Sequence, residues 1–326
     1  ALHLCGPALA APPAQTPYAA RPEVRAFVRE LVQRHGFIEK ELLYLFSRAR
    51  RLPAVLKAVE PPPPGRGRSW EAYRATFVNE RHVQAGLDFW RTHAAPLARA
   101  QREYGVADEI IVAILGVETF YGRNTGRWRV ADALATLAFD YPPRAEFFRQ
   151  ELESYLLFAR ETGLDVFSVQ GSYAGAIGIP QFMPGSYRKY AVDFDGDGVR
   201  DLRANPADAI GSVANFLKQH GWRSGELIVL PARVSGSAHR AMIEAGVEPQ
   251  FKLAQLRQFG VEARTNLALE TAVALIDLET PQAPTEYRLG LHNFYVLTRY
   301  NRSAFYAAAV HDLAQELRAR RQDGGR

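Results

Sequence analysis

The chain has 326 residues, of which 47% are hydrophobic and 23% are charged. It therefore has enough apolar material for a sizeable core and is not an intrinsically disordered protein. A formal net charge of +5 weakly favours an anionic partner. No run combines clustered basic residues with interleaved aromatic residues, which argues against nucleic acid. The single cysteine, Cys5, excludes an intrachain disulfide framework and a cysteine-based metal site.

The opening residues predict an exported protein. Residues 1–20 are interpreted as the end of an apolar export segment and a linker, because Ala8-Leu9-Ala10 has the small-residue pattern of a cleavage site. Cys5 leaves a lipid anchor as an alternative, although Leu4 stands where a small residue is usual. Elsewhere the sequence has no apolar stretch long enough to span a bilayer. We therefore expect a soluble body that reaches a membrane only through such an anchor.

Helical periodicity dominates the first half of the chain. Residues 21–69 are expected to form an N-terminal helical region with two short helices over 22–59 and a stiff Pro-rich spacer at 61–67. The helical pattern resumes over 70–104 as one long stretch, and further helices are expected over 132–163.

Glu118 lies in an otherwise apolar segment, Ile110-Ile-Val-Ala-Ile-Leu-Gly-Val-Glu-Thr-Phe-Tyr-Gly122. An ionised carboxyl loses hydration among apolar side chains, so the pKa of Glu118 should rise and leave a protonated acid near neutral pH. Such an acid can give a proton to a leaving oxygen. The alternative is a structural glutamate that turns outward or pairs with Arg123.

A second carboxylate is not evident. Asp108, Glu109 and Asp132 are candidates, but nothing in the sequence singles one out. Ordinary glycoside hydrolysis uses two carboxylates, whereas a lone glutamate fits a substrate that supplies its own nucleophile. Residues 171–185, rich in Gly and Pro, are predicted to be a functional loop with a short helix inside it.

Residues 193–208 predict a structural calcium loop. Aspartates occupy the first, third, fifth and ninth positions and Gly the sixth, as in an EF-hand, but Ala204 stands at the twelfth. The last ligand must therefore come from elsewhere, and Asp208 is the best candidate. The alternative is a solvated acidic turn. The predicted ligands are Asp193, Asp195, Asp197, Val199 and Asp208.

The residue composition changes after Trp222, from a helical to a strand-forming pattern. β-branched and apolar residues predict strands at 227–234, 250–253 and 271–278, which would form a small β-rich lobe over 224–290. Helices over 291–326 are expected to complete the core.

Five segments together carry a resemblance. They are Gly116-Val-Glu-Thr-Phe-Tyr-Gly122, 171–178 with Gln181-Phe-Met-Pro184, the Asp-rich loop, 205–215, and Phe294-Tyr-Val-Leu-Thr-Arg-Tyr-Asn301. In this order the chain resembles the lytic murein transglycosylase B family from about Arg21 to Leu317. The resemblance implies a mainly α, lysozyme-like core over 70–223, with an N-terminal helical lobe, a small β lobe and a calcium loop.

The resemblance also implies the reaction. The family cuts the β-1,4 bond between N-acetylmuramic acid and N-acetylglucosamine in peptidoglycan without water and leaves a 1,6-anhydromuramoyl end. Glu118 would be the acid and then the base. The positions that match the family's substrate-binding residues are Ser172, Gln181, Tyr73, Arg144, Phe182, Met183, Phe216, Tyr300, Asn301 and Tyr306.

Two departures from the family pattern stand out. Pro142 and Pro143 precede a single Arg144 where a pair of arginines is expected, which affects the hold on a peptide or lactyl carboxylate. Phe216 replaces a usual tyrosine and removes one hydroxyl contact. Core packing is the alternative role for Tyr73, Tyr300 and Tyr306.

We therefore predict a periplasmic, monomeric lytic transglycosylase that acts on peptidoglycan glycan strands and needs no organic cofactor. An association with the outer membrane and a partnership with cell-wall synthases stay open. The rival hypotheses are a muramidase that uses water and a non-catalytic peptidoglycan-binding scaffold.

Overall fold

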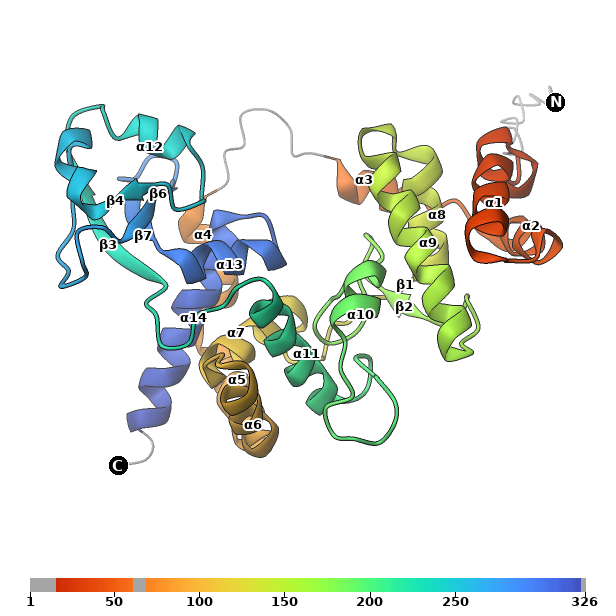
Figure 1. Cartoon of the computed structure of the whole chain (residues 1–326), viewed down its shortest axis with the longest axis horizontal. Helices are drawn as coiled ribbons and strands as arrows, with labels where there is room; N and C mark the ends of the chain where they lie inside the picture. The colour runs from red at the N-terminus through yellow and green to blue at the C-terminus, as the bar shows by residue number, and fades with distance from the viewer. Residues whose placement is uncertain (1–15, 61–68, 324–326) are drawn as a thin grey trace, which may run out of the picture.

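The computed structural model describes residues 16–60 and 69–323. Helices dominate, and a small sheet lies at one side of them (Figure 1). The predicted export segment with Cys5 and the Pro-rich spacer fall outside the described residues, apart from 16–20. The described α-helices are α1 (Pro22–His35), α2 (Glu39–Arg48), α3 (Pro53–Val59), α4 (Trp70–Phe77), α5 (Glu80–Thr92), α6 (Ala94–Tyr104), α7 (Asp108–Thr119), α8 (Val130–Asp140), α9 (Ala145–Thr162), α10 (Pro184–Tyr190), α11 (Pro206–Gln219), α12 (Arg240–Glu244), α13 (His292–Tyr300) and α14 (Ala304–Asp323).

The N-terminal helices pack against α8, and Figure 1 shows them on the side of the molecule away from the sheet. Phe27 of α1 and Phe46 of α2 meet the ring of Phe139 at centroid distances of 5.7 and 6.0 Å. Three helices form where two were predicted, because Gly36 ends α1 in a left-handed conformation and Pro53 begins α3. The predicted division of the chain into five segments stays a prediction.

The centre of the molecule is α7, which contacts α5, α6, α11 and α14. Every residue from Ile110 to Gly116 is buried, because this helix is apolar on all faces. The pattern over 70–104 forms three helices rather than one long stretch. The side chain of Ser69 caps α4 and that of Asn79 caps α5, so each begins a new helix.

Within the predicted loop, 171–185, residues 171–183 contain no helix, and only the first two residues of α10 fall inside its bounds. Ile177 instead forms isolated bridges with Gly171 and Phe182, and α10 begins only at Pro184. Gly175 and Gly178 adopt φ of 86° and 77°, which a right-handed helix does not allow. The loop is therefore irregular and held by its own backbone bonds.

The β lobe holds an antiparallel sheet with the strand order β4-β6-β7-β3-β5. Strands form in each of the three predicted places, and two further strands, β5 and β7, were not predicted. Pro231 lies within β3 opposite Arg288 of β7. The described strands are β1 (Trp128–Arg129), β2 (Gln170–Gly171), β3 (Val229–Val234), β4 (Phe251–Lys252), β5 (Val261–Glu262), β6 (Ala272–Leu278) and β7 (Glu286–Gly290). Short 3-10 helices are η1 (Tyr18–Ala20), η2 (Pro142–Arg144) and η3 (Leu253–Phe259).

A buried ion-pair network attaches the β lobe to the helices. Arg288 of β7 and Arg74 of α4 both bind Asp312 of α14, with shortest N–O distances of 2.6 and 2.7 Å. Burial alone would raise the pKa of Asp312, but the neighbouring His311 and the two arginines hold it well below its usual range. The network fixes α4 and α14 relative to the sheet, and these two helices carry Tyr73 and Tyr306.

Candidate active site

Glu118 lies in the last turn of α7, and its Oε1 accepts a hydrogen bond of 2.7 Å from the hydroxyl of Tyr306. Burial of the carboxyl raises the pKa of Glu118 to about 7, and the bond from Tyr306 lowers it in part. The residue as a whole keeps an intermediate exposure, so solvent still reaches it. Arg123 does not pair with it, because its guanidinium lies 4.9 Å from the ring centroid of Phe120. The arrangement is that of a protonated acid within reach of a ligand.

The other acidic residues near Glu118 in the sequence have different partners. Asp108 is ten positions earlier, at the opposite end of α7, and accepts a bond from the indole of Trp90. Glu109 lies 3.7 Å from Arg318, and Asp132 accepts a backbone N–H from Arg50. Among the described residues, no carboxylate contributes to the pKa shift of Glu118.

The turn that follows Glu118 has an unusual backbone. Phe120 and Tyr121 adopt φ of 51° and 60°, a region that non-glycine residues rarely occupy, and Gly122 follows with 85°. The hydroxyl of Thr119 donates to the carbonyl of Ile179 at 2.8 Å and accepts the N–H of Gly122 at 2.9 Å. Thr119 therefore joins the end of α7 to the 171–183 loop and fixes where Glu118 points.

Tyr121 also holds this turn, through a contact with α5. Its hydroxyl donates to the carbonyl of His82 at 2.9 Å. A Cβ added at Gly116 would lie 2.6 Å from that hydroxyl, so only glycine leaves room for the ring. Thr119 and Tyr121 were not among the predicted site residues. The closely spaced Gly116 and Gly122 were the signal in the sequence for a close approach here.

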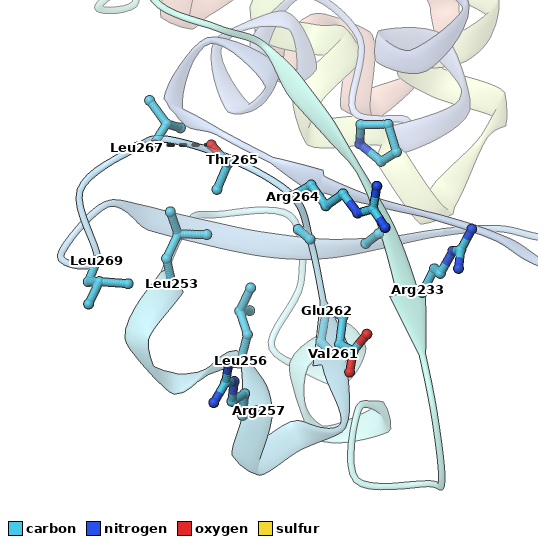
Figure 2. A pocket seen from close by; sticks show the side chains of 13 residues that line it. Arg233, Leu253, Leu256, Arg257, Val261, Glu262, Arg264, Thr265, Leu267 and Leu269 are labelled. Carbon is cyan, nitrogen blue, oxygen red and sulfur yellow. Dashed lines mark hydrogen bonds between the residues drawn. The ribbon is translucent and has the colours of Figure 1, made fainter.

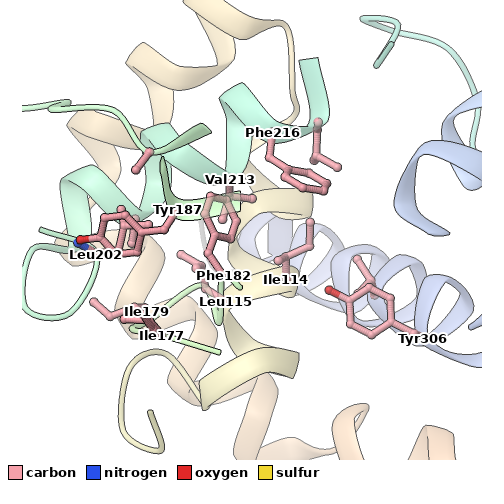
Figure 3. Packing of buried hydrophobic residues seen from close by; sticks show 14 of the residues in the cluster. Ile114, Leu115, Ile177, Ile179, Phe182, Tyr187, Leu202, Val213, Phe216 and Tyr306 are labelled. Carbon is pink, nitrogen blue, oxygen red and sulfur yellow. The ribbon is translucent and has the colours of Figure 1, made fainter. Parts of the chain in front are cut away.

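Aromatic rings gather beside the acid. Tyr300 and Tyr306 are nearly parallel, with centroids 6.3 Å apart, and the hydroxyl of Tyr300 donates to the carbonyl of Pro180. Phe216 and Phe182 lie 4.9 and 5.8 Å from the ring of Tyr300. Burial raises the pKa of Tyr306 well above its ordinary value, so its hydroxyl stays a hydrogen-bond donor. Phe182 itself lies in the hydrophobic core, next to Leu115 and Val213 (Figure 3).

The predicted loop residues Ser172 and Gln181 have well-defined polar contacts. The Oγ of Ser172 accepts the backbone N–H groups of Ala174 and Ala176, so its own hydrogen remains to be donated. The side-chain nitrogen of Gln181 donates to the carbonyls of Thr125 and Gly178 at 3.1 and 2.9 Å. These bonds fix the amide orientation and leave its oxygen as an acceptor.

The remaining predicted substrate residues lie in three different places. Tyr73 and Asn301 line one shallow pocket between α4 and the end of α13. Met183 is half-buried and precedes α10. Arg144, by contrast, is exposed, and its guanidinium lies 4.4 Å over the ring of Phe147 rather than among the residues around Glu118.

The Asp-rich loop brings three of its predicted ligands together. Asp193, Asp195 and Asp197 each offer an oxygen within 4.8 Å of the others. Backbone N–H groups, first among them that of Gly198, hold the pKa of Asp193 below its usual range. Three carboxylates at this separation match the hard oxygen ligands that calcium prefers, so the donor set fits that ion.

Asp208 is not part of that group of three. It is fully buried, and its two oxygens accept the backbone N–H groups of Phe194 and Asp201, each at 2.7 Å. In this arrangement its carboxylate ties the two ends of the loop together. Asn205, which was not predicted, reaches Asp195 instead with a 2.8 Å bond. Val199 is exposed and donates its N–H to Asp197.

A separate cavity of about 780 Å³ lies in the β lobe (Figure 2). Its lining includes Leu253, Leu256 and Leu267 beside Arg233 and Arg264. Neither Glu118 nor any of the predicted substrate residues lines it. Size alone therefore does not locate the chemistry of this protein, and the buried acid and its hydroxyl partner are the better guide.

Comparison with known proteins identifies the family. The family model described as "Transglycosylase SLT domain" matches residues 19–315. The chain belongs to this family. It is 42% identical over 308 residues to the membrane-bound lytic murein transglycosylase B of Escherichia coli K12, a match that covers 92% of this chain and 84% of that protein.

Solved structures of lytic transglycosylases have the same fold. The catenated SltB1 of Pseudomonas aeruginosa matches with a TM-score of 0.87 and 48% identity over 93% of this chain and 99% of that one. Escherichia coli Slt35 in complex with calcium matches with 0.82 and 40% over 93% and 95%. SltB3 of Pseudomonas aeruginosa in complex with NAG-NAM-pentapeptide matches with 0.77 and 30% over 91% and 79%.

These matches confirm the predicted family, the mainly helical lysozyme-like fold and the enzyme class, a lytic transglycosylase. The relatives named above include one that binds calcium and one that binds a peptidoglycan fragment. Within residues 16–60 and 69–323, no helix has both the length and the apolar character to cross a membrane.

Proposed function

We propose that the enzyme cleaves the β-1,4 bond between N-acetylmuramic acid and N-acetylglucosamine without water and leaves a 1,6-anhydromuramoyl end. The observation that carries the proposal is the carboxyl of Glu118, which is bound to Tyr306 and whose pKa shift has no contribution from any carboxylate of the described residues. A hydrolase that activates water uses a second carboxylate. A lone carboxyl instead suits a substrate that contains the nucleophile.

Glu118 acts twice in this reaction. Protonated Glu118 gives its proton to the glycosidic oxygen, the bond from that oxygen to C1 of the muramic sugar breaks, and the N-acetylglucosamine side leaves as an alcohol. Ionised Glu118 then takes the proton of the C6 hydroxyl as its oxygen bonds to C1, which restores the acid. A pKa of about 7 suits both roles at neutral pH. Internal attack also avoids capturing a water, an advantage that can reach roughly 7–11 kcal/mol.

The groups around Glu118 would hold the sugar rings. The amide oxygen of Gln181 and the hydroxyl hydrogen of Ser172 are the acceptor and the donor that an N-acetyl group requires. The ring of Tyr300 provides a flat surface for the apolar face of a sugar, and Tyr73 with Asn301 extends the site along the shallow pocket.

Calcium is the metal that we propose for the Asp-rich loop. Asp193, Asp195 and Asp197 would hold it, with the carbonyl of Val199 as a further ligand. Its role would be structural, because the ion would close a loop whose ends Asp208 already joins. This proposal is consistent with the calcium complex of the Slt35 relative.

We propose that the enzyme acts on glycan strands in the periplasm, because its proposed substrate, peptidoglycan, lies there. Product chemistry tests the proposal against its two rivals. Sacculi are digested in water enriched in oxygen-18, and the released fragments are weighed. Muramoyl ends that are lighter by one water and free of label are expected. Labelled reducing ends would instead establish a muramidase, and a preparation that releases nothing would indicate a binding scaffold.

A further inference from the structure

Two arginines contact one aromatic ring, that of Phe120, in the turn that follows Glu118. The guanidinium carbon of Arg81, from α5, lies 4.7 Å from the ring centroid of Phe120, and that of Arg123, from the turn, lies 4.9 Å from it. Both side chains are exposed, and Phe120 itself is only 7% exposed beneath them. Within the described parts of the chain, neither guanidinium has a carboxylate at ion-pair distance.

Several arginines of the described residues lie over rings, and Phe167 likewise has two, Arg48 and Arg129, of which Arg129 pairs with Asp132. Arg99 over Phe194 pairs with Glu103, whereas the charges of Arg81 and Arg123 have no such compensation. Contact with the ring is worth only about 0.5–1 kcal/mol at an exposed site. Two like charges that both contact one ring repel each other, and an anion bound beside them would reduce that repulsion. The geometry is therefore prepared for an anionic group from outside the protein.

The pair also lies beside the predicted substrate residues. Phe120 is two residues after Glu118, and Thr125, two residues after Arg123, accepts a hydrogen bond from Gln181. On the other side, rings continue from Phe120 to His82 at 4.8 Å and to Phe77 at 6.0 Å from His82. The ring of Tyr73 follows at 5.2 Å from that of Phe77. Ring contacts thus connect Phe120 to Tyr73, and the bond to Thr125 connects Gln181 to the chain that follows Arg123.

We propose that Arg81 and Arg123 bind a free carboxylate of the stem peptide attached to the muramic acid sugar. The inference rests on the proposed function, because it takes the substrate to be peptidoglycan. Guanidinium groups bind carboxylates through two parallel hydrogen bonds, and these bonds are stronger than those between neutral groups. In peptide-bearing strands the lactyl carboxyl is consumed in the amide bond to the peptide. The remaining free carboxylates therefore belong to the peptide, and this pair makes the enzyme select strands that carry it.

The test compares two substrates and matched variants. One substrate is peptide-bearing glycan strands with free carboxylates, and the other is the same strands after their carboxylates have been amidated. For the double variant Arg81→Gln/Arg123→Gln, KM for the free-carboxylate strands should rise by about tenfold or more while kcat changes little, the pattern of a lost binding interaction. Its KM for amidated strands should equal that of the parent. Arg29→Gln, the same change on exposed α1, should leave both values unaltered.

A double variant with unchanged KM on the free-carboxylate strands overturns the proposal, as does an equal rise on both substrates. The double lysine variant keeps the charge and should recover part of the preference, which separates binding from the covering of Phe120 by the arginine stems. The two proposals fail in distinguishable ways. Products with reducing ends would refute the transglycosylase reaction, whereas the preference for free carboxylates is read from KM alone.

Discussion

The enzyme uses the same chemical group in two opposite environments. Glu118 lies in a largely apolar, aromatic surrounding with one hydroxyl partner, and burial of its carboxyl raises its pKa to about 7. Asp193 lies on the surface with three backbone N–H donors, which keep the pKa of its carboxyl below its usual range. The first arrangement favours the protonated acid and the second the charged ligand.

The comparison shows that residue type alone did not decide the role of each carboxylate. An apolar helix raises the pKa of Glu118, as the proposed proton donor requires, and a loop rich in glycine keeps the pKa of Asp193 low, as the proposed metal ligand requires. Asp208 lies between these extremes, because burial raises the pKa of its carboxyl while backbone N–H groups of the loop lower it. The predictions below test each environment separately.

The largest effect is expected from Glu118→Gln, which keeps shape and hydrogen bonding but removes the titratable proton. General acid–base catalysis contributes roughly 10²–10⁴-fold, so at least that much activity on sacculi should be lost. Glu109→Gln, a matched change at the first turn of the same helix, should retain parental activity. A Glu118→Gln enzyme that works at more than about a tenth of the parental rate would contradict the assignment.

The same variant has a predictable stability. The folded pKa of Glu118, about 7, exceeds its ordinary value of 4.5, so ionisation of the buried carboxyl destabilises the fold. This loss of stability is absent below pH 4.5, grows as the pH rises from 4.5 to about 7, and is complete above 7. At about 1.4 kcal/mol per pKa unit it amounts to up to about 3 kcal/mol. Glu118→Gln should therefore be more stable than the parent at pH 8 and equally stable at pH 4 in denaturant unfolding.

The sequence predicted what depends on composition and periodicity. The apolar run of α7 already indicated a buried Glu118, and the Asp spacing indicated the loop carboxylates that the structure groups together. The sequence did not reveal which bonds hold the turn after Glu118, because the hydrogen bond from Thr119 to Ile179 joins residues sixty positions apart. The position of Asp208 likewise depends on tertiary packing.

Secondary structure was predicted incorrectly where contacts between distant residues, rather than local sequence preferences, determine it. The helix predicted inside 171–185 does not form at Gly175 and Gly178, whose positive φ angles allow close approach to neighbouring side chains and backbone. Strand β5 has only two residues, and β7 begins with Glu286 and contains Arg288. β5 is too short to show an apolar alternation, and in β7 the alternation is limited to Tyr287 and Leu289. Both strands pair with β3.

The second effect concerns the surface loop. Removal of calcium by a chelator should lower the Tm, and calcium at a hundredfold excess over its Kd should restore about 2.7 kcal/mol of stability. Asp195→Asn should abolish this response, whereas Asp323→Asn, an equal charge change at the exposed end of α14, should preserve it. Identical melting curves of the parent with chelator and with calcium would remove the metal from the account.

The smallest effect is expected from Tyr306→Phe. The lost hydrogen bond lowers the pKa of Glu118 in the parent, so the variant should have a higher value. A bond to a charged group is worth about 1.5–3 kcal/mol, or roughly one to two pKa units. The acid must be protonated, so the alkaline limb of the pH–rate profile should move upward by that amount. Tyr300→Phe, which loses only the bond to Pro180, should leave the limb in place.

The central claim is that the protein environment holds Glu118 as an acid near neutral pH. The most direct test is a titration of the glutamate side-chain carboxyls, labelled with carbon-13, by NMR in the full chain. One resonance should titrate near pH 7 and should be missing from Glu118→Gln. A Glu118 resonance that titrates near 4.5, the ordinary value for glutamate, would contradict the account.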